Sequence, residues 1–136
     1  MFYRKVNVVT IKKLKLKINL GKNPWKYIKI LSNIFLINTL TKQALIVNYK
    51  KVTNYDYLDL SKDLNDRYTE IKYNDNIFYH YFKNFDKEET LQFEWILIKN
   101  SFVISFTTTI SSKKSQDEIE IEYEVVNSIM KQITNI

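Results

Sequence analysis

Residues 102–133 read FVISFTTTISSKKSQDEIEIEYEVVNSIMKQI, and this stretch decides the fold class. Its first nine residues are rich in β-branched and aromatic side chains, which favours a β-strand. Its second half has apolar residues at spacings of four and three, which is typical of a helix with one buried face. Those helix positions are Ile119, Tyr123, Val126, Met130 and Ile133. A strand followed directly by an amphipathic helix indicates an α+β protein.

The helix is predicted over residues 116–134. Ser115 stands three residues before Glu118, which is the spacing of a capping box. The acidic residues lie in the early turns and Lys131 lies near the end, as the helix dipole prefers. One alternative stays open, because residues 117–124 also alternate in period two and could form a strand of opposite charge to the lysine-rich segment near the N-terminus.

Upstream of this stretch, three more segments carry strand signals. They are separated by NDN, by NFDKEE and by Asn100–Ser101, which are typical turn sequences. Together with residues 102–110 they predict a four-stranded meander. The three segments are EIKY at 70–73, IFYHYF at 77–82 and LQFEWILIK at 91–99.

A lysine-rich segment near the N-terminus could be either a disordered basic arm or a strand. It spans residues 11–20 and reads IKKLKLKINL. Its period of two separates lysines from apolar residues, as in a half-buried strand. A disordered arm does not need an apolar side chain at every second position, so we favour the strand and keep the arm as the alternative. The two faces carry Lys13, Lys15 and Lys17 on one side and Leu14, Leu16 and Ile18 on the other.

The remaining elements complete an α+β fold. A proline in KNPW ends the first strand, and the apolar segments at 28–37 and 44–49 predict a hairpin across the turn TLTKQ. A mid-chain helix is predicted from an Asp56 cap, with apolar residues at Tyr57, Leu60, Leu64, Tyr68 and Ile71. We therefore expect one domain over 1–136, with a twisted, mainly antiparallel sheet of about six to seven strands and two helices packed on it.

The cysteine count, the lengths of the uncharged runs and the distribution of charge exclude some classes of protein. The chain has no cysteine, which excludes disulfides and thiolate chemistry. No uncharged run approaches the ~20 apolar residues of a membrane span, and the N-terminus lacks a signal-peptide core, so we expect a soluble, cytoplasmic protein. Of the 21 basic residues, twelve lie in residues 1–55, which hold no acidic residue. Such asymmetry can indicate a polyanion partner, although Lys, Asn and Ile make up 51 of 136 residues, as an AT-rich coding sequence would produce.

No residue pattern predicts catalysis or a metal site. His80, the only histidine, has no nucleophile or further ligand beside it in sequence and is interpreted as a packed or surface residue. Asp59, Asp63 and Asp66 fit a solvated helix face better than a calcium loop. A single glycine, Gly21, cannot build a phosphate-binding loop. We expect a protein that is not an enzyme and has no cofactor.

Nucleic-acid binding is a distant alternative. Basic residues and ten tyrosines could combine charge with base stacking. The aromatic residues fall mostly at core-compatible spacings, however, and no Gly/aromatic RNA-binding pattern is present.

The element order resembles that of the PsbP-like superfamily, and in particular its small bacterial DcrB-like and Eag-type effector-chaperone branch. The resemblance covers nearly the whole chain and rests on Pro24 and Trp25 after the first strand, Trp95, and the run Phe106–Thr109 before the last helix. The chain departs from the family at Asn100 and Ser101, where the family has glycine, and at Asn23 before the proline. We expect both tryptophans to be core residues rather than interface anchors.

This resemblance implies a non-catalytic adaptor that binds a protein. Relatives serve secreted toxins, either as immunity proteins that neutralise a toxin or as chaperones that shield an effector. We favour immunity, because the chain is rich in charge, which speeds selective capture, and a chaperone needs a broad apolar face. We expect a monomer or homodimer. The candidate partner-binding residues are Glu118, Glu120, Glu122, Glu124, Lys13, Lys15 and Lys17.

Overall fold

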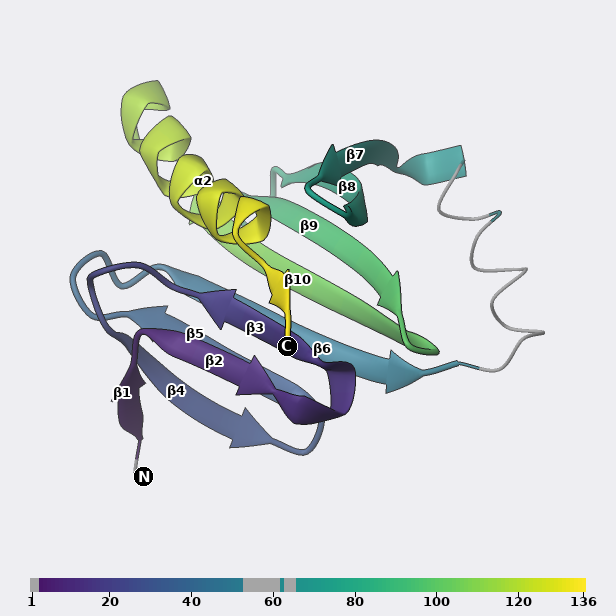
Figure 1. Cartoon of the computed structure of the whole chain (residues 1–136). Coiled ribbons are helices and arrows are strands. Elements are labelled where there is room, and N and C mark those ends of the chain that lie inside the picture. The colour runs from purple at the N-terminus through teal and green to yellow at the C-terminus, as the bar shows by residue number, and fades with distance from the viewer. Residues whose placement is uncertain (1–2, 53–61, 63–65) are drawn as a thin grey trace.

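A computed structural model describes residues 3–52, 62 and 66–136. Its largest feature is an antiparallel sheet of eight strands in the order β1-β4-β5-β6-β10-β9-β8-β7 (Figure 1). The strands are β1 (Arg4–Val6), β4 (Trp25–Ile30), β5 (Asn33–Asn38), β6 (Ala44–Lys51), β7 (Thr69–Tyr73), β8 (Asn76–Phe85), β9 (Thr90–Lys99) and β10 (Phe102–Ser111). The predicted α+β class is confirmed, with more strands than expected.

A second, smaller sheet and one helix pack on the same face of the large sheet (Figure 1). The small sheet has the order β11-β3-β2 and consists of β2 (Val8–Ile11), β3 (Leu16–Asn19) and β11 (Thr134–Asn135). The helix, α2 (Gln116–Lys131), contacts β10 and β3. Two covering elements thus share one sheet face.

The core lies between these layers. Trp25 on β4 and Trp95 on β9 are fully buried, as are Phe78 and Phe106. The indole N–H of Trp25 donates to the Leu20 carbonyl at 3.2 Å. The prediction that both tryptophans are core residues is confirmed.

The meander of four strands is also confirmed. β8 pairs with β9 from Phe78↔Leu97 to Phe85↔Thr90, and β9 pairs with β10 along its whole length. Asn100 and Ser101 form the two-residue turn between β9 and β10 with φ of 53° and 66°. Positive φ at both central positions is the signature of a type I′ turn, so these residues adopt a conformation for which glycine is usually preferred.

The strand predicted for residues 11–20 is wrong in one respect. Lysines face solvent and Leu14, Leu16 and Ile18 are fully buried, as predicted. The backbone, however, turns through a 3₁₀ helix, η1 (Lys12–Leu14), and Lys15 has φ of 54°. The segment is therefore a hairpin, in which β2 pairs with β3 from Val8↔Asn19 to Ile11↔Leu16. The alternation of lysine with apolar residues is the same in one continuous strand as in two strands joined by a tight turn, so it does not distinguish them.

The strand count was too low for a similar reason. Residues 28–37 were expected to form one arm of a hairpin, but β4 and β5 pair with each other across a two-residue turn. Leu31 occupies this turn with φ of 56° and is 87% exposed. An apolar residue in a left-handed turn carries no turn signal, which hid this hairpin.

The terminal helix is confirmed, and a strand at 117–124 is excluded. Ser115 Oγ accepts from the Glu118 amide at 3.2 Å, which is the predicted cap. The helix ends at Lys131 rather than at 134, because residues 134–135 form β11 beside β3.

The mid-chain helix predicted from Asp56 lies almost entirely outside the described residues. Its predicted end is wrong, because Ile71 pairs with Phe78 in β7 rather than continuing a helix. Among the described elements, α2 is the one α-helix, and η1 is a single 3₁₀ turn.

Candidate functional site

The chain's only histidine lies at the centre of an aromatic cluster between α2 and the sheet. His80 on β8 and Trp95 on β9 are register partners, so their side chains emerge side by side on the face that α2 covers. The two rings stack with centroids 4.4 Å apart and planes 19° apart. Tyr123 of α2 closes the group, with its ring 5.7 Å from Trp95. Together with Phe93, these residues form what we call the His80 cluster.

Both ring nitrogens of His80 are hydrogen-bonded. Nδ1 lies 2.8 Å from the Glu94 carbonyl oxygen, and Nε2 lies 3.1 Å from the Tyr123 hydroxyl. Because a carbonyl oxygen can only accept, Nδ1 must carry the proton in the neutral ring, and Nε2 then accepts from the Tyr123 hydroxyl. In the neutral ring, this geometry allows one tautomer, with the proton on Nδ1.

The electrostatics agree with this arrangement. Burial lowers the pKa of His80, and the hydrogen bond to the Glu94 backbone opposes this only in part. Burial likewise raises the pKa of Tyr123, with Tyr73 and Glu124 adding to the effect. A neutral histidine and a protonated tyrosine are therefore expected near neutral pH, and these two states allow the Tyr123 hydroxyl to donate to Nε2.

A pocket of about 230 Å³ opens beside the cluster, between α2 and strands β8 and β9. We call it the α2 pocket. The ring of Phe93 lies 4.8 Å from Tyr123 and 5.1 Å from Phe82, which is itself 51% exposed. The walls are nearly all apolar. The lining residues are His80, Phe93, Gln116, Ile119, Glu120 and Tyr123.

The four candidate glutamates of α2 do not form one surface. Residues four apart share a helix face, so Glu118 and Glu122 lie on one side and Glu120 and Glu124 on another. Glu122 is buried and pairs with Lys114 at 2.7 Å, so it is committed to the fold. Glu118 is exposed and accepts from the Ser115 hydroxyl at 3.0 Å. Glu120 and Glu124 are exposed, and Glu120 alone of the four lines the α2 pocket.

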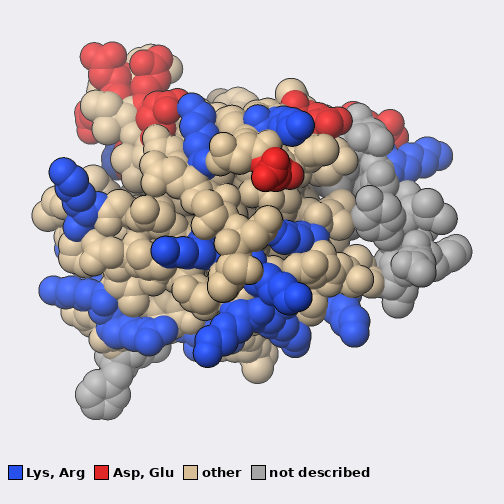
Figure 2. Space-filling view, in the orientation of Figure 1, with Lys and Arg blue, Asp and Glu red and all other residues tan. Residues whose placement is uncertain are grey.

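The three candidate lysines are all exposed but occupy different elements. Lys13 lies in η1 with its Nζ 5.5 Å from the centre of the Phe102 ring. Lys15 follows in the tight turn, and Lys17 lies within β3. They belong to a basic side of the molecule, and Figure 2 shows this side below the acidic N-terminal turns of α2.

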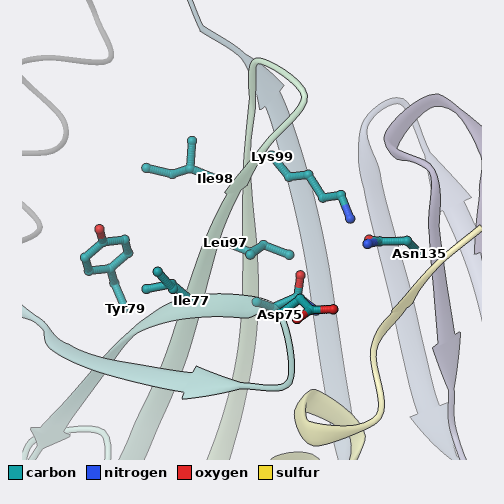
Figure 3. Close-up of a pocket in the computed structure, with 8 residues that line it drawn as sticks. Asp75, Ile77, Tyr79, Leu97, Ile98, Lys99 and Asn135 are labelled. Carbon is teal, nitrogen blue, oxygen red and sulfur yellow. The ribbon is translucent and has the colours of Figure 1, made fainter.

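A second cavity, of about 380 Å³, opens where two strands separate. β8 begins at Asn76 but pairs with β9 only from Phe78↔Leu97, so Ile98 and Lys99 have no β8 partner. Figure 3 shows Lys99 reaching toward Asn135, with Asp75 beside Leu97. Partial burial lowers the pKa of Lys99.

The opposite face of the large sheet is partly apolar. Ile28, Phe35 and Ile46 are adjacent register partners on β4, β5 and β6, and each is half-buried. Among the described elements, none packs over this row, because α2 and the small sheet lie on the other face.

Glu94 lies on the same face of the large sheet as this row. The Tyr68 hydroxyl donates to the Glu94 carboxyl at 3.4 Å, and burial raises the pKa of Glu94.

Residues 3–52, 62 and 66–136 contain no group of three or more His, Cys, Asp or Glu side chains that could hold a metal ion. No helix in them is long and apolar enough to cross a bilayer.

Sequence reasoning found His80 and Tyr123 as separate residues but missed the pocket between them. The alternation of β8 places His80 with Phe78 and Phe82, and the helix spacing places Tyr123 on the apolar stripe of α2. The two residues are 43 positions apart, and no local pattern predicts their hydrogen bond. Phe93 and Gln116 carried no functional signal at all.

Known proteins resemble this chain in structure but not in sequence. No family model and no curated protein matches the sequence. Among solved structures, the chain is similar to cyanobacterial PsbP (CyanoP) from Synechocystis sp. PCC 6803, with a TM-score of 0.65 and 7% identity over 95% of this chain and 91% of that one. It is also similar to a Bacteroides thetaiotaomicron protein, with a TM-score of 0.63 and 12% identity over 96% of this chain. The chain spans about half of that protein, 48% of its length. The fold is therefore PsbP-like.

Proposed function

We propose that this PsbP-like chain is a non-catalytic protein-binding module, and that it acts in the cytoplasm as an immunity protein that binds and neutralises a secreted bacterial toxin. The observation that carries the proposal is the separation of charge. The twelve Lys and Arg residues of positions 1–55 lie on β1–β6 and their turns, and the acidic residues of α2 lie at the opposite end of the view in Figure 2.

Such a dipolar surface suits fast and selective capture of a protein. Opposite charges on a partner raise the association rate and impose one orientation, while like charges reject other partners. The His80 cluster supports a binding role rather than catalysis, because both nitrogens of its histidine are held by other protein groups.

An effector chaperone of the DcrB-like or Eag-type branch is the second candidate. The half-buried row Ile28, Phe35 and Ile46 favours it, because an apolar sheet face can receive an apolar segment of an effector. Replacing Phe35 and Ile46 with Thr keeps strand propensity and removes apolar surface. Loss of effector binding in that variant, with toxin neutralisation absent, would favour the chaperone.

The immunity proposal is tested by affinity capture from the native cells at moderate salt, followed by a toxicity assay of the captured protein. We expect one stoichiometric protein whose toxicity falls when this chain is bound. Reversing Glu120 and Glu124 to lysine should weaken the complex and reduce its salt dependence. Reversing Asp86 and Glu88, two exposed acids of the β8–β9 turn, makes the same change in net charge and should have a smaller effect. Capture of nucleic acid alone, lost when Lys13, Lys15 and Lys17 become Gln, would contradict the proposal.

A further inference from the structure

We propose that the α2 pocket is the binding site for an arginine side chain of the protein partner. This inference rests on the proposed protein-binding function and names the group on the partner that α2 recognises. Three features lead to it: the aromatic walls of the pocket, the hydrogen-bond acceptors on the residues around it, and the uncompensated negative charge of Glu120.

The walls fit a flat cation with an aliphatic stem. Phe93 and Tyr123 meet at 4.8 Å with planes 57° apart, so the pocket offers two aromatic surfaces that are not parallel. Ile119 adds an aliphatic wall. A guanidinium group stacks on aromatic faces and is more weakly hydrated than an ammonium group, and its methylene stem packs on apolar surface. A pocket of about 230 Å³ is large enough for such a head group.

The hydrogen bonds around the pocket leave acceptors available. His80 Nδ1 is committed to the Glu94 carbonyl, so the Tyr123 hydroxyl proton points to Nε2 and the tyrosine oxygen keeps its lone pairs. The Gln116 side-chain amide donates to Glu120 Oε1 at 3.2 Å. The side-chain carbonyl oxygen of Gln116 and the second carboxylate oxygen of Glu120 remain available as acceptors. Arginine carries five N–H donors and no acceptor, so it complements these oxygens.

The charge at the pocket is not compensated. The described chain places no Lys, Arg or His nitrogen within 4.0 Å of the Glu120 carboxylate. The two lysines that precede α2 are paired with other carboxylates. Lys113 pairs with Glu89 at 2.8 Å and Lys114 with Glu122 at 2.7 Å. The positive end of the α2 dipole opposes a cation here, but Asp117 and Glu118 in the first turn offset it. Glu120 is therefore free to pair with a guanidinium.

The first experiment titrates the protein with N-acetyl-arginine methylamide while His80 and Ile119 signals are followed by NMR. The citrulline analogue has nearly the same shape without the charge, and the norleucine analogue keeps only the apolar stem. We expect saturable shifts with the arginine probe and at least about tenfold weaker binding of the other two. Equal binding of the norleucine probe would mean a general apolar site, and equal binding of the citrulline probe would remove the role of charge. Either result overturns the proposal.

Variants of α2 give the matched comparison. Glu120→Gln should abolish the preference for arginine over citrulline. Glu124→Gln removes the same charge one turn later and does not line the pocket, so it should retain most of the preference. Equal losses in both variants would point to the general field of the helix and contradict the site. Unchanged thermal midpoints establish that both variants are folded.

The proposed function can fail separately. If the toxin is captured and Glu120→Gln binds it as tightly as wild type does, the pocket assignment is wrong and the immunity role stands. If the arginine probe binds selectively but no partner protein is captured, the site stands and the immunity role fails.

Discussion

His80 shows how one side chain takes its chemistry from its neighbours. Free histidine titrates near pH 6.5, where it could act as a base or bind a metal. Here the ring is stacked on Trp95 and donates to the Glu94 carbonyl while it accepts from Tyr123. Its role is to fix the direction of the Tyr123 hydroxyl, and through it the acceptors of the α2 pocket.

The lowered pKa of His80 predicts a loss of stability on acidification. A group whose pKa is lower in the folded than in the unfolded protein takes up more protons when the chain unfolds. Its contribution is therefore complete above pH 6.5 and decreases as the pH falls through the range below it. Urea unfolding at pH 7.5 and pH 5.5 should show a larger loss of unfolding free energy for wild type than for His80→Gln.

Nearby titratable groups set the controls for that measurement. Glu94 has a raised pKa in the folded protein, so its contribution to the unfolding free energy increases as the pH falls. Glu94→Gln removes this contribution and should therefore enlarge the loss of unfolding free energy at low pH. Glu120 in the pocket and Glu124 beside Tyr123 favour a charged histidine, which works against the trend. A wild type that gains stability relative to His80→Gln at pH 5.5 would show that these carboxylates outweigh burial.

At the scale of elements, the hairpin turns are unusual in having no glycine. Within the part of the chain that the structure describes, seven residues other than glycine have positive φ, among them Leu31, Asn100 and Ser101 at the ends of paired strands. Side chains with a Cβ are strained in this region, and Asn tolerates it better than Ser or Leu. The hairpins form because the free energy of strand pairing outweighs the backbone strain in the turns. For the same reason a turn forms at Leu31, where the residue type does not predict one.

Replacing Ser101 with glycine should stabilise the protein. The change creates Asn-Gly at residues 100–101, the preferred pair for a type I′ turn, and relieves the strain at φ 66°. The Asn100 side chain, which donates to the Leu14 carbonyl at 3.0 Å, is left in place. We expect a gain of about 0.5–1 kcal/mol in unfolding free energy by urea titration.

Gly21 supplies the converse control. Its φ is 93°, and no atom lies within 4 Å of the position a Cβ would take. Gly21→Ala should cost about 1 kcal/mol through backbone strain alone. If Ser101→Gly destabilised the chain while Gly21→Ala behaved as expected, the serine hydroxyl would have a structural role.

At the scale of the whole molecule, the fold gathers the basic half of the sequence on one side. Residues 1–55 supply β1–β6, and their twelve cations have no acidic residue among them. The acidic residues that the structure describes all lie within residues 66–136, on α2, on strands β7 and β9 and in the segments between elements. The ion pairs Lys113–Glu89 and Lys114–Glu122 lie within that second half, so they do not neutralise the basic side.

Self-repulsion on the basic side predicts that salt stabilises the protein. Between about 0.01 M and 1 M salt the Debye length falls from about 30 Å to about 3 Å, which screens the repulsion. We expect unfolding free energy to rise by about 0.5–1 kcal/mol over this range. The gain should shrink when Lys15 and Lys17 become Gln. Changing Lys72 and Lys87 of the second half to Gln should leave it nearly unchanged, and equal effects of the two pairs would contradict the asymmetry.

The sequence by itself determined the elements whose signals are local. Alternation and three-four spacing depend only on which side of a strand or helix a residue faces, so the meander, α2 and its Ser115 cap, and the buried tryptophans could all be predicted. The same patterns do not record a tight turn within an apolar run. For that reason two hairpins, at Lys12–Lys15 and at Leu31, were missed.

The candidate site was decided only by the tertiary structure. The acidic row of α2 is continuous in sequence, yet helix geometry divides it between two sides and packing buries Glu122 against Lys114. The α2 pocket exists because β8, β9 and α2 bring His80, Phe93 and Tyr123 together across up to 43 residues of chain. Long-range contacts of this kind depend on how layers pack, and periodicity along the chain carries no information about which layers meet.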